Sequence, residues 1–160
     1  MNKETDKFIK EGIIRYKQAN QVYLTFRSEM QKKLQSILKK RKRWGTLKPD
    51  FNSVRSTRFS GAALNARIKV EYEDVVQIIV IVMDWQISES DFPYFCVWLE
   101  DSNNRILDVQ KTDWDDNYFY ENKTLQYKPD PDNYDLEKDF NHLLDDFIKI
   151  FNNDDQSKIE

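Results

Sequence analysis

The feature that most constrains the fold is a run of apolar residues near the N-terminus, each three or four residues after the last. No proline interrupts the run, and its members are Ile9, Ile13, Tyr16, Ala19, Tyr23, Phe26, Met30, Leu34 and Ile37. An α-helix has 3.6 residues per turn, so this spacing aligns them along one side of a single helix. We predict a helix over about residues 5–43, with Thr5 as its N-cap.

This helix is long relative to the chain that contains it. At about 1.5 Å per residue it would extend roughly 50–60 Å. A compact domain of 160 residues is only about 30–40 Å across. We therefore expect the helix either to break near Asn20, inside the polar stretch "QANQ", or to protrude from the domain at one end. We favour a single long helix.

Five consecutive cations stand where this helix is expected to end. Cations complement the negative C-terminal end of a helix dipole, glycine is common just after the last turn, and proline prevents continuation. Gly45 and Pro49 follow in that order. Helix termination accounts for part of the charge but does not require five cations. We therefore keep a candidate basic patch, which comprises Lys39, Lys40, Arg41, Lys42, Arg43 and Trp44.

The pattern changes to a period of two further along the chain. In "ARIKVEY", residues 66–72, apolar and charged side chains alternate, which is typical of a strand with one buried face. Glu73-Asp74 predicts a tight turn into "VVQIIVIVMDW". That segment and "YFCVWLE" are apolar on both faces, which indicates a sheet covered on both sides. "DSNNR" predicts a further hairpin turn.

These patterns predict an α+β fold: a long N-terminal helix, an antiparallel meander of four to five strands, and a C-terminal helix. We place the strands within about residues 58–128 and the closing helix at about 133–152. The whole of 1–152 is expected to form a single domain, followed by a frayed tail at 153–160. Two helices must then cover two apolar faces of the sheet. If both lie on one face, the other needs a second subunit or a ligand, so a homodimer stays open.

Composition narrows the class of protein. Hydrophobic residues make up 39% of the chain and aromatics 14%, which argues against disorder. The single cysteine, Cys96, excludes a disulfide framework and a cysteine-based zinc site. The polar N-terminus does not resemble a signal peptide, and the longest apolar run is too short to span a bilayer. We expect a cytoplasmic protein that does not bind membranes. Abundant Asn, Lys and Ile favour a bacterial or phage source.

Charge is divided unevenly along the chain. Residues 1–56 hold 15 Lys and Arg and 5 Asp and Glu, a net of +10, whereas residues 57–160 hold 10 and 23, a net of −13. Such asymmetry indicates charged partners, unless the two parts pack together and neutralise each other. Both interpretations remain open at this stage.

Catalytic signals are weak. The PD-(D/E)xK nuclease pattern needs an acid on one strand and an acid-x-lysine pair on the next, but the strand after Asp50 offers no second acid. Asp113, Asp115 and Asp116 lack the spacing and the glycine of a calcium loop. A lone histidine such as His142 is more often structural. We predict no catalytic residues, no metal site and no cofactor.

Between residues 108 and 146 acidic side chains are dense and aromatic ones lie among them, a composition that suits docking on a basic protein surface. The candidate contact residues are Trp114, Asp115, Asp116, Tyr118 and Tyr120. The leading hypothesis is a small non-enzymatic binding protein that docks on a macromolecular partner and neutralises or regulates it, like an immunity or anti-defence protein. The alternative is a nucleic-acid-binding module that uses the basic patch. A divergent metal-dependent nuclease, using Asp50 or Asp84, comes third.

Overall fold

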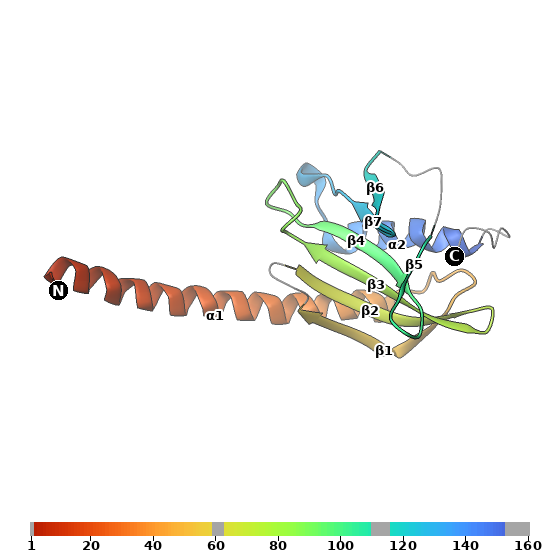
Figure 1. Cartoon of the computed structure of the whole chain (residues 1–160), viewed down its shortest axis with the longest axis horizontal. Helices are drawn as coiled ribbons and strands as arrows, with labels where there is room; N and C mark the ends of the chain where they lie inside the picture. The colour runs from red at the N-terminus through yellow and green to blue at the C-terminus, as the bar shows by residue number, and fades with distance from the viewer. Residues whose placement is uncertain (1, 59–62, 110–115, 153–160) are drawn as a thin grey trace.

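The computed structural model describes residues 2–58, 63–109 and 116–152. It confirms the predicted α+β class, with a helix, an antiparallel sheet and a second helix in chain order (Figure 1). The elements are α1 (Lys3–Lys40), β1 (Lys48–Arg58), β2 (Ala63–Tyr72), β3 (Val75–Asp84), β4 (Tyr94–Glu100), β5 (Ile106–Leu107), β6 (Tyr118–Glu121), β7 (Thr124–Tyr127), η1 (Pro131–Asn133) and α2 (Leu136–Asn152). The predicted tail, 153–160, lies outside the described residues.

The sheet has more strands than the sequence predicts: seven within the described ranges, instead of four or five. Its order is β1-β2-β3-β4-β7-β6, and β5 pairs with β4 off this path. The meander holds from β1 to β4, after which the β6–β7 hairpin inserts β7 beside β4. β1 lies ahead of the range, about residues 58–128, in which we placed the strands. Its pairing register shifts between Asp50 and Arg55, and this irregularity hides the strand period in the sequence.

The tight turns follow the residue chemistry of hairpins. Glu73 and Asp74 have φ of 49° and 64° and close the predicted two-residue turn between β2 and β3. Both residues adopt the left-handed conformation that such turns require. Asn104 does the same at φ 60° in the turn that we predicted from "DSNNR".

α1 is continuous from Lys3 to Lys40 and does not break at Asn20. Its N-cap is Asn2, whose side chain accepts a hydrogen bond from the Glu4 amide at 3.1 Å, and not Thr5 as predicted. It ends earlier than expected because Arg41 is already extended, with ψ of 131°. Within the described ranges, no helix combines the length and the apolar character needed to cross a bilayer.

Both helices pack on the same face of the sheet. Leu34, Ile37 and Leu38 of α1 share one core with the apolar side of α2 and with alternate residues of β2, β3 and β4. The two helices are also joined by ion pairs, such as Lys33 Nζ to Glu137 Oε2 at 3.2 Å. The arrangement with one helix on each face is therefore not the one adopted.

The opposite face of the sheet carries a smaller apolar cluster, formed by Ala63, Val80, Val82 and Cys96. The side chains of all four are buried. Near them, Arg67 Nη2 lies 2.6 Å from Glu100 Oε2 in a partly buried ion pair that joins β2 to β4. Although both helices lie on the other face of the sheet, this face therefore still buries apolar side chains and holds an ion pair.

Candidate functional site

The most unusual feature of the fold is the N-terminal part of α1, which extends well beyond the sheet (Figure 1). We call residues 3–27 the arm. Nearly every residue of the arm is exposed, including large apolar ones: Phe8 and Tyr16 are each 76% exposed and Val22 is 70% exposed. Exposed side chains of this size are usual singly, whereas a concentration of them on one element is uncommon on a monomer.

The apolar residues of the arm continue the side of α1 that forms the core. Ile9, Tyr16 and Tyr23 are seven residues apart, and the same step leads on to Met30 and Ile37. A seven-residue step drifts by only about 20° per repeat on a straight helix. Ile37 is buried beneath the sheet, whereas Ile9 and Tyr16 are exposed. One side of the helix is therefore covered at one end and bare at the other.

We define the apolar stripe by the exposed large residues that lie on or beside this side of the arm. They are Phe8, Ile9, Ile13, Tyr16, Tyr23 and Phe26. The two smallest residues on the same side, Gly12 and Ala19, lie on either side of Tyr16. Nothing lies within 4 Å of the position that a Cβ on Gly12 would take, so the chain itself leaves this space open.

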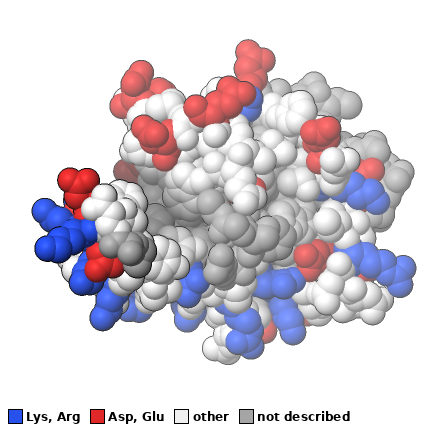
Figure 2. Space-filling view, turned by 60° about the vertical axis from the view of Figure 1, so that its left-hand side comes forward, with Lys and Arg blue, Asp and Glu red and all other residues white. Residues whose placement is uncertain are grey.

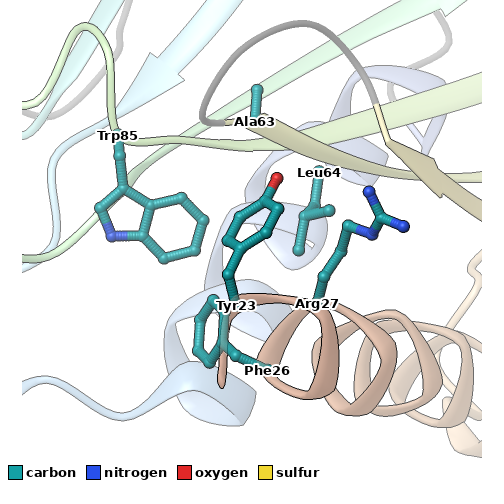
Figure 3. Close-up of a pocket in the computed structure, with 6 residues that line it drawn as sticks. All are labelled: Tyr23, Phe26, Arg27, Ala63, Leu64 and Trp85. Atoms are coloured by element: carbon teal, nitrogen blue, oxygen red, sulfur yellow. The ribbon is translucent and has the colours of Figure 1, made fainter. Parts of the chain in front are cut away.

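A pocket lies at the root of the arm, where α1 meets the sheet (Figure 3). Tyr23, Phe26 and Arg27 of the helix face Ala63, Leu64 and Trp85 of the sheet across a cavity of about 200 Å³. Ala63 pairs with Asp84, the residue before Trp85. The register of β2 and β3 therefore places all three sheet residues at one end of the sheet.

Ring contacts fix the walls of this pocket. The Phe26 and Trp85 rings meet edge to face, with centroids 5.9 Å apart and planes 69° apart. The Arg27 guanidinium carbon lies 5.8 Å from the Tyr23 ring centroid, within reach of a cation–π contact. Among the described residues, Arg27 makes no ion pair. The pocket therefore offers apolar walls and one cation, a combination that suits an apolar side chain with a carboxylate nearby.

The structure divides the candidate basic patch into two groups. Arg41 and Trp44 are buried. The Arg41 guanidinium lies 2.6 Å from Asp145 Oδ1, and the Trp44 indole donates to the Arg41 carbonyl oxygen at 2.9 Å. Burial lowers the pKa of Arg41, although the hydrogen bond to Asp145 acts in the opposite direction. These two residues join α1 to α2 and are engaged inside the fold.

The other members of the patch face outward. Lys39, Lys40, Lys42 and Arg43 are exposed, and Arg43 shares Asp145 with Arg41, at 3.0 Å. They surround an open depression together with Phe51, which is 41% exposed. This arrangement presents cations beside one accessible aromatic ring.

The acidic and aromatic candidates are also divided. Trp114 and Asp115 lie outside the described residues, and Asp116 is exposed in the turn before β6. Tyr118 is buried, and its hydroxyl donates to Asp146 Oδ2 at 2.6 Å. Tyr120 donates to Asp108 Oδ1 at 2.6 Å. Both tyrosines thus use their hydroxyl groups within the fold.

Asp146 is the centre of a polar cluster between β6 and α2. Besides Tyr118, it accepts a hydrogen bond from Lys149 Nζ at 2.8 Å, and His142 Nε2 lies 3.4 Å from it. Burial alone would raise the pKa of Asp146, but the hydrogen bonds from Lys149 and Tyr118 outweigh it and leave the pKa lowered. The carboxylate therefore stays ionised and helps to hold α2 against the sheet.

The two charged parts of the chain neutralise each other only in part. Cations from the first 56 residues pair with later acids in four ion pairs among the described residues: Lys33–Glu137, Arg41–Asp145, Arg43–Asp145 and Lys48–Glu71. In the view of Figure 2, Lys and Arg still gather along the lower side of the molecule, and Asp and Glu along the upper side. Both charged surfaces therefore persist beside the internal ion pairs.

The two acids considered for a nuclease lie far apart. Asp50 pairs with Lys69 and Asp84 pairs with Ala63, so they are six residues apart along β2, about 20 Å. One metal ion cannot bind both. In the described part of the chain, no group of three or more His, Cys, Asp and Glu side chains is arranged to hold a metal ion. Burial, and then the charge of Asp84, raises the pKa of the Cys96 thiol to about 12, which makes this cysteine a poor nucleophile.

No protein-family model, curated protein or solved structure matches this chain. The sequence interpretation found the stripe but missed its pocket, because Leu64 and Trp85 show no pattern that links them to the helix. One sequence feature did distinguish the arm from a core helix. A seven-residue step also places polar Asn20 and Arg27 on the stripe side, where a core helix would be apolar.

Proposed function

We propose that this protein is a non-enzymatic binding protein that docks on another protein chain, and that the arm is its docking element. The observation that carries the proposal is the apolar stripe, which follows the core side of α1 for several turns beyond the sheet. The immunity-like or anti-defence-like role is one form that such docking can take, and it stays a prediction.

The exposed area of the stripe supports this proposal. Its six residues are between 40% and 76% exposed. If each side chain presents about 200 Å² when free, the stripe exposes on the order of 600 Å². This equals the upper end of the largest patch found on typical monomers, about 300–600 Å². The geometry also suits helix recognition, since a straight amphipathic helix presents its anchors to a groove or to another helix.

Site-specific photo-crosslinking tests the proposal in the cells that make the protein. A photoreactive phenylalanine analogue at Phe8 would lie on the stripe, and the same analogue at Gln18 would lie on the opposite side of the arm. We expect a defined crosslinked species from position 8 and none from position 18. Equal crosslinking from both positions, or none from position 8, would overturn the proposal.

Nucleic-acid binding is the second candidate, and the exposed cations around Phe51 favour it. Lys39, Lys40 and Lys42 can reach phosphates, and the Phe51 ring can stack on a base. Salt titration of binding to random single-stranded DNA and RNA tests it. Replacing Lys39, Lys40 and Lys42 together by Ala should reduce the slope of log K against log salt by about 2–3.

A matched control for this test replaces three cations elsewhere. Lys7, Lys10 and Lys17 lie on the exposed arm, so their replacement by Ala changes net charge equally. If nucleic acid binds at the depression, this control should reduce the slope by less than the first variant. If both variants reduce the slope equally, the binding is nonspecific electrostatic attraction and not a contact at the depression. No binding at about 100 mM salt would exclude nucleic-acid binding as the function.

A further inference from the structure

We infer that the arm binds the arm of a second copy of this chain. The two arms pair antiparallel about a two-fold axis near Tyr16, and the N-terminal end of each arm lies at the root pocket of the other copy. The inference rests on the proposed function only in taking the arm as the docking element. It adds the identity of the partner and the direction in which the two chains run.

The order of residues along the stripe is close to symmetric about Tyr16. Ile9 and Tyr23 stand seven residues before and after it, and Ile13 and Ala19 stand three residues before and after. In an antiparallel pair centred on Tyr16, Ile9 of one copy faces Tyr23 of the other, and Ile13 faces Ala19. A large residue then meets a small one beside each central tyrosine, as interdigitating side chains require. A two-fold interface needs this self-complementarity, because the same surface serves both partners.

Charge is complementary between the two ends of the arm. The first turn of α1 is acidic, with Glu4 and Asp6, and the root pocket carries Arg27. In the same register Asp6 lies opposite Phe26, next to Arg27. The carboxylate of one copy therefore approaches the guanidinium of the other, while Phe8 and Ile9 approach the apolar walls of the pocket. Within one chain the nearest ion-pair partner of Asp6 is Lys10, at 3.6 Å in an exposed contact that contributes little.

The length of the arm fits this arrangement. Lys3, the first helical residue, lies opposite Glu29, and Met30 is the first residue of the repeat that the sheet begins to cover. The first turn of the partner helix therefore lies at the root pocket, where the body of the first copy (the sheet and α2) begins to cover α1.

A parallel pair fits less well. From Met30 onward the stripe side of α1 is occupied by the chain's own sheet, so two parallel helices would have to separate before that point. They would also place both copies of Arg27 side by side at the root, where like charges repel. The antiparallel pair separates the two bodies and places each Arg27 near an acid.

The exposed area is sufficient for a dimer. A standard interface buries about 800 Å² on each partner, and the stripe alone supplies on the order of 600 Å² of apolar surface. Polar residues at the edges of the stripe, together with the half-buried Trp85 at the pocket, add to this area.

Mass measurement of the full purified chain, by light scattering or sedimentation over about a hundredfold range of concentration, tests the inference. We expect a dimer that dissociates on dilution. Tyr16→Asp, which places a charge at the two-fold axis, should weaken the dimer by at least about 30-fold. Gln18→Asp is the matched control, because it adds the same charge to the outer side of the same helix. It should change the dissociation constant by less than about threefold.

Cysteine crosslinking tests the direction of pairing. Cys96 is buried, so introduced cysteines on the arm report on the contact. Under mild oxidation Tyr16→Cys should form a crosslinked dimer, because residue 16 meets its own copy. Ile9→Cys alone should not, because the two copies of residue 9 are 14 positions apart along the pair, about 21 Å. Crosslinking of Ile9→Cys to itself would overturn the antiparallel direction.

A charge reversal tests the contact at the pocket. Arg27→Asp should weaken the dimer, and adding Asp6→Arg to it should restore most of the lost affinity, because the ion pair is reformed with the charges exchanged. Restoration by Gln18→Arg, on the other side of the helix, would overturn this contact.

The outcomes separate the inference from the proposed function. A chain that stays monomeric at all concentrations overturns the second copy as occupant. If photo-crosslinking from Phe8 then still captures one defined protein, the docking role of the arm stands with a different partner. If neither contact is found, both fail.

Discussion

The two parts of α1 have the same periodicity but different environments. From Met30 to Lys40 the apolar side lies against the sheet and α2, and Leu34, Ile37 and Leu38 are at most 3% exposed. In the arm, the same side of the helix is open. Amphipathic spacing therefore indicates which side of a helix is apolar and favours burial, but not which part of the protein, or which partner, buries it.

The two parts also differ in what limits their stability. An isolated helix is marginal in water, and most helical stability in proteins comes from tertiary packing. The buried part has that packing. In a single chain the arm has only local ion pairs, such as Lys10–Asp6, and its continuity with the buried part. Gly12 weakens it further, because glycine disfavours a helix interior.

The largest expected difference between the two parts is in core packing. Leu38→Ala should lower the free energy of unfolding by about 2–5 kcal/mol, because it removes buried methyl groups and leaves a cavity. Val22→Ala, which truncates a mostly exposed side chain of the arm, should change it by less than about 0.5 kcal/mol. Denaturant unfolding of both variants measures this. Similar losses would show that the arm is part of the cooperative core.

The second prediction concerns the junction where α1 ends. Arg41→Ala should cost about 2 kcal/mol, because it removes the charge-assisted hydrogen bond between a buried guanidinium and Asp145. Arg43→Ala removes an exposed cation from the same carboxylate and should cost less than about 1 kcal/mol. Thermal unfolding of the two single variants at neutral pH compares them. Equal costs would mean that burial does not distinguish the two arginines.

The third prediction is a pH dependence that belongs to the body and not to the arm. Because the pKa of Asp146 is lowered in the fold, its contribution is complete above the unfolded value of about 3.9 and is lost as the pH falls through the folded value. Asp146→Asn should flatten the acid side of the stability curve and cost about 1–2 kcal/mol at pH 7. Asp116→Asn, in an exposed turn, is the control. Helicity of the arm, followed by hydrogen exchange, should not depend on Asp146.

The smallest expected effect is local to the arm. Gly12→Ala should stabilise the helix by about 1 kcal/mol, since alanine loses less backbone entropy and a Cβ meets nothing within 4 Å. Ala19→Gly should have the opposite effect. Hydrogen exchange of the arm amides reports both changes, and the unfolding midpoint of the body should stay the same. A shift of that midpoint would contradict the separation of the two parts.

The sequence predicted the main outline of the fold because helix and strand periods are local. The long helix, the Glu73-Asp74 turn and the apolar side of α2 all depend on neighbours within a few residues. β1 was missed because it is an irregular, mostly exposed edge strand. The placement of both helices on one face was left open, because periodicity shows which side of a helix is apolar but not which face of the sheet it meets.

The candidate sites were harder to predict, because they depend on contacts between distant segments. Arg41 and Arg43 are indistinguishable in a run of five cations, and only the approach of Asp145 from α2 separates a buried cation from an exposed one. Tyr118 resembled a docking residue until the fold placed its hydroxyl on Asp146. The root pocket joins residues about 40 and 60 positions apart, which no local pattern connects.

The continuity of α1 also has a mechanical consequence. A helix without an internal proline behaves as a stiff rod, and this one is clamped at one end by Leu34, Ile37 and Leu38. Over an arm of roughly 37 Å, a tilt of about 5° at the clamp moves the tip by about 3 Å. Conversely, a force on the N-terminal end of the arm acts through the full length of the helix on its buried part. A displacement far from the sheet is therefore transmitted to the contacts of α1 with β1 and β2.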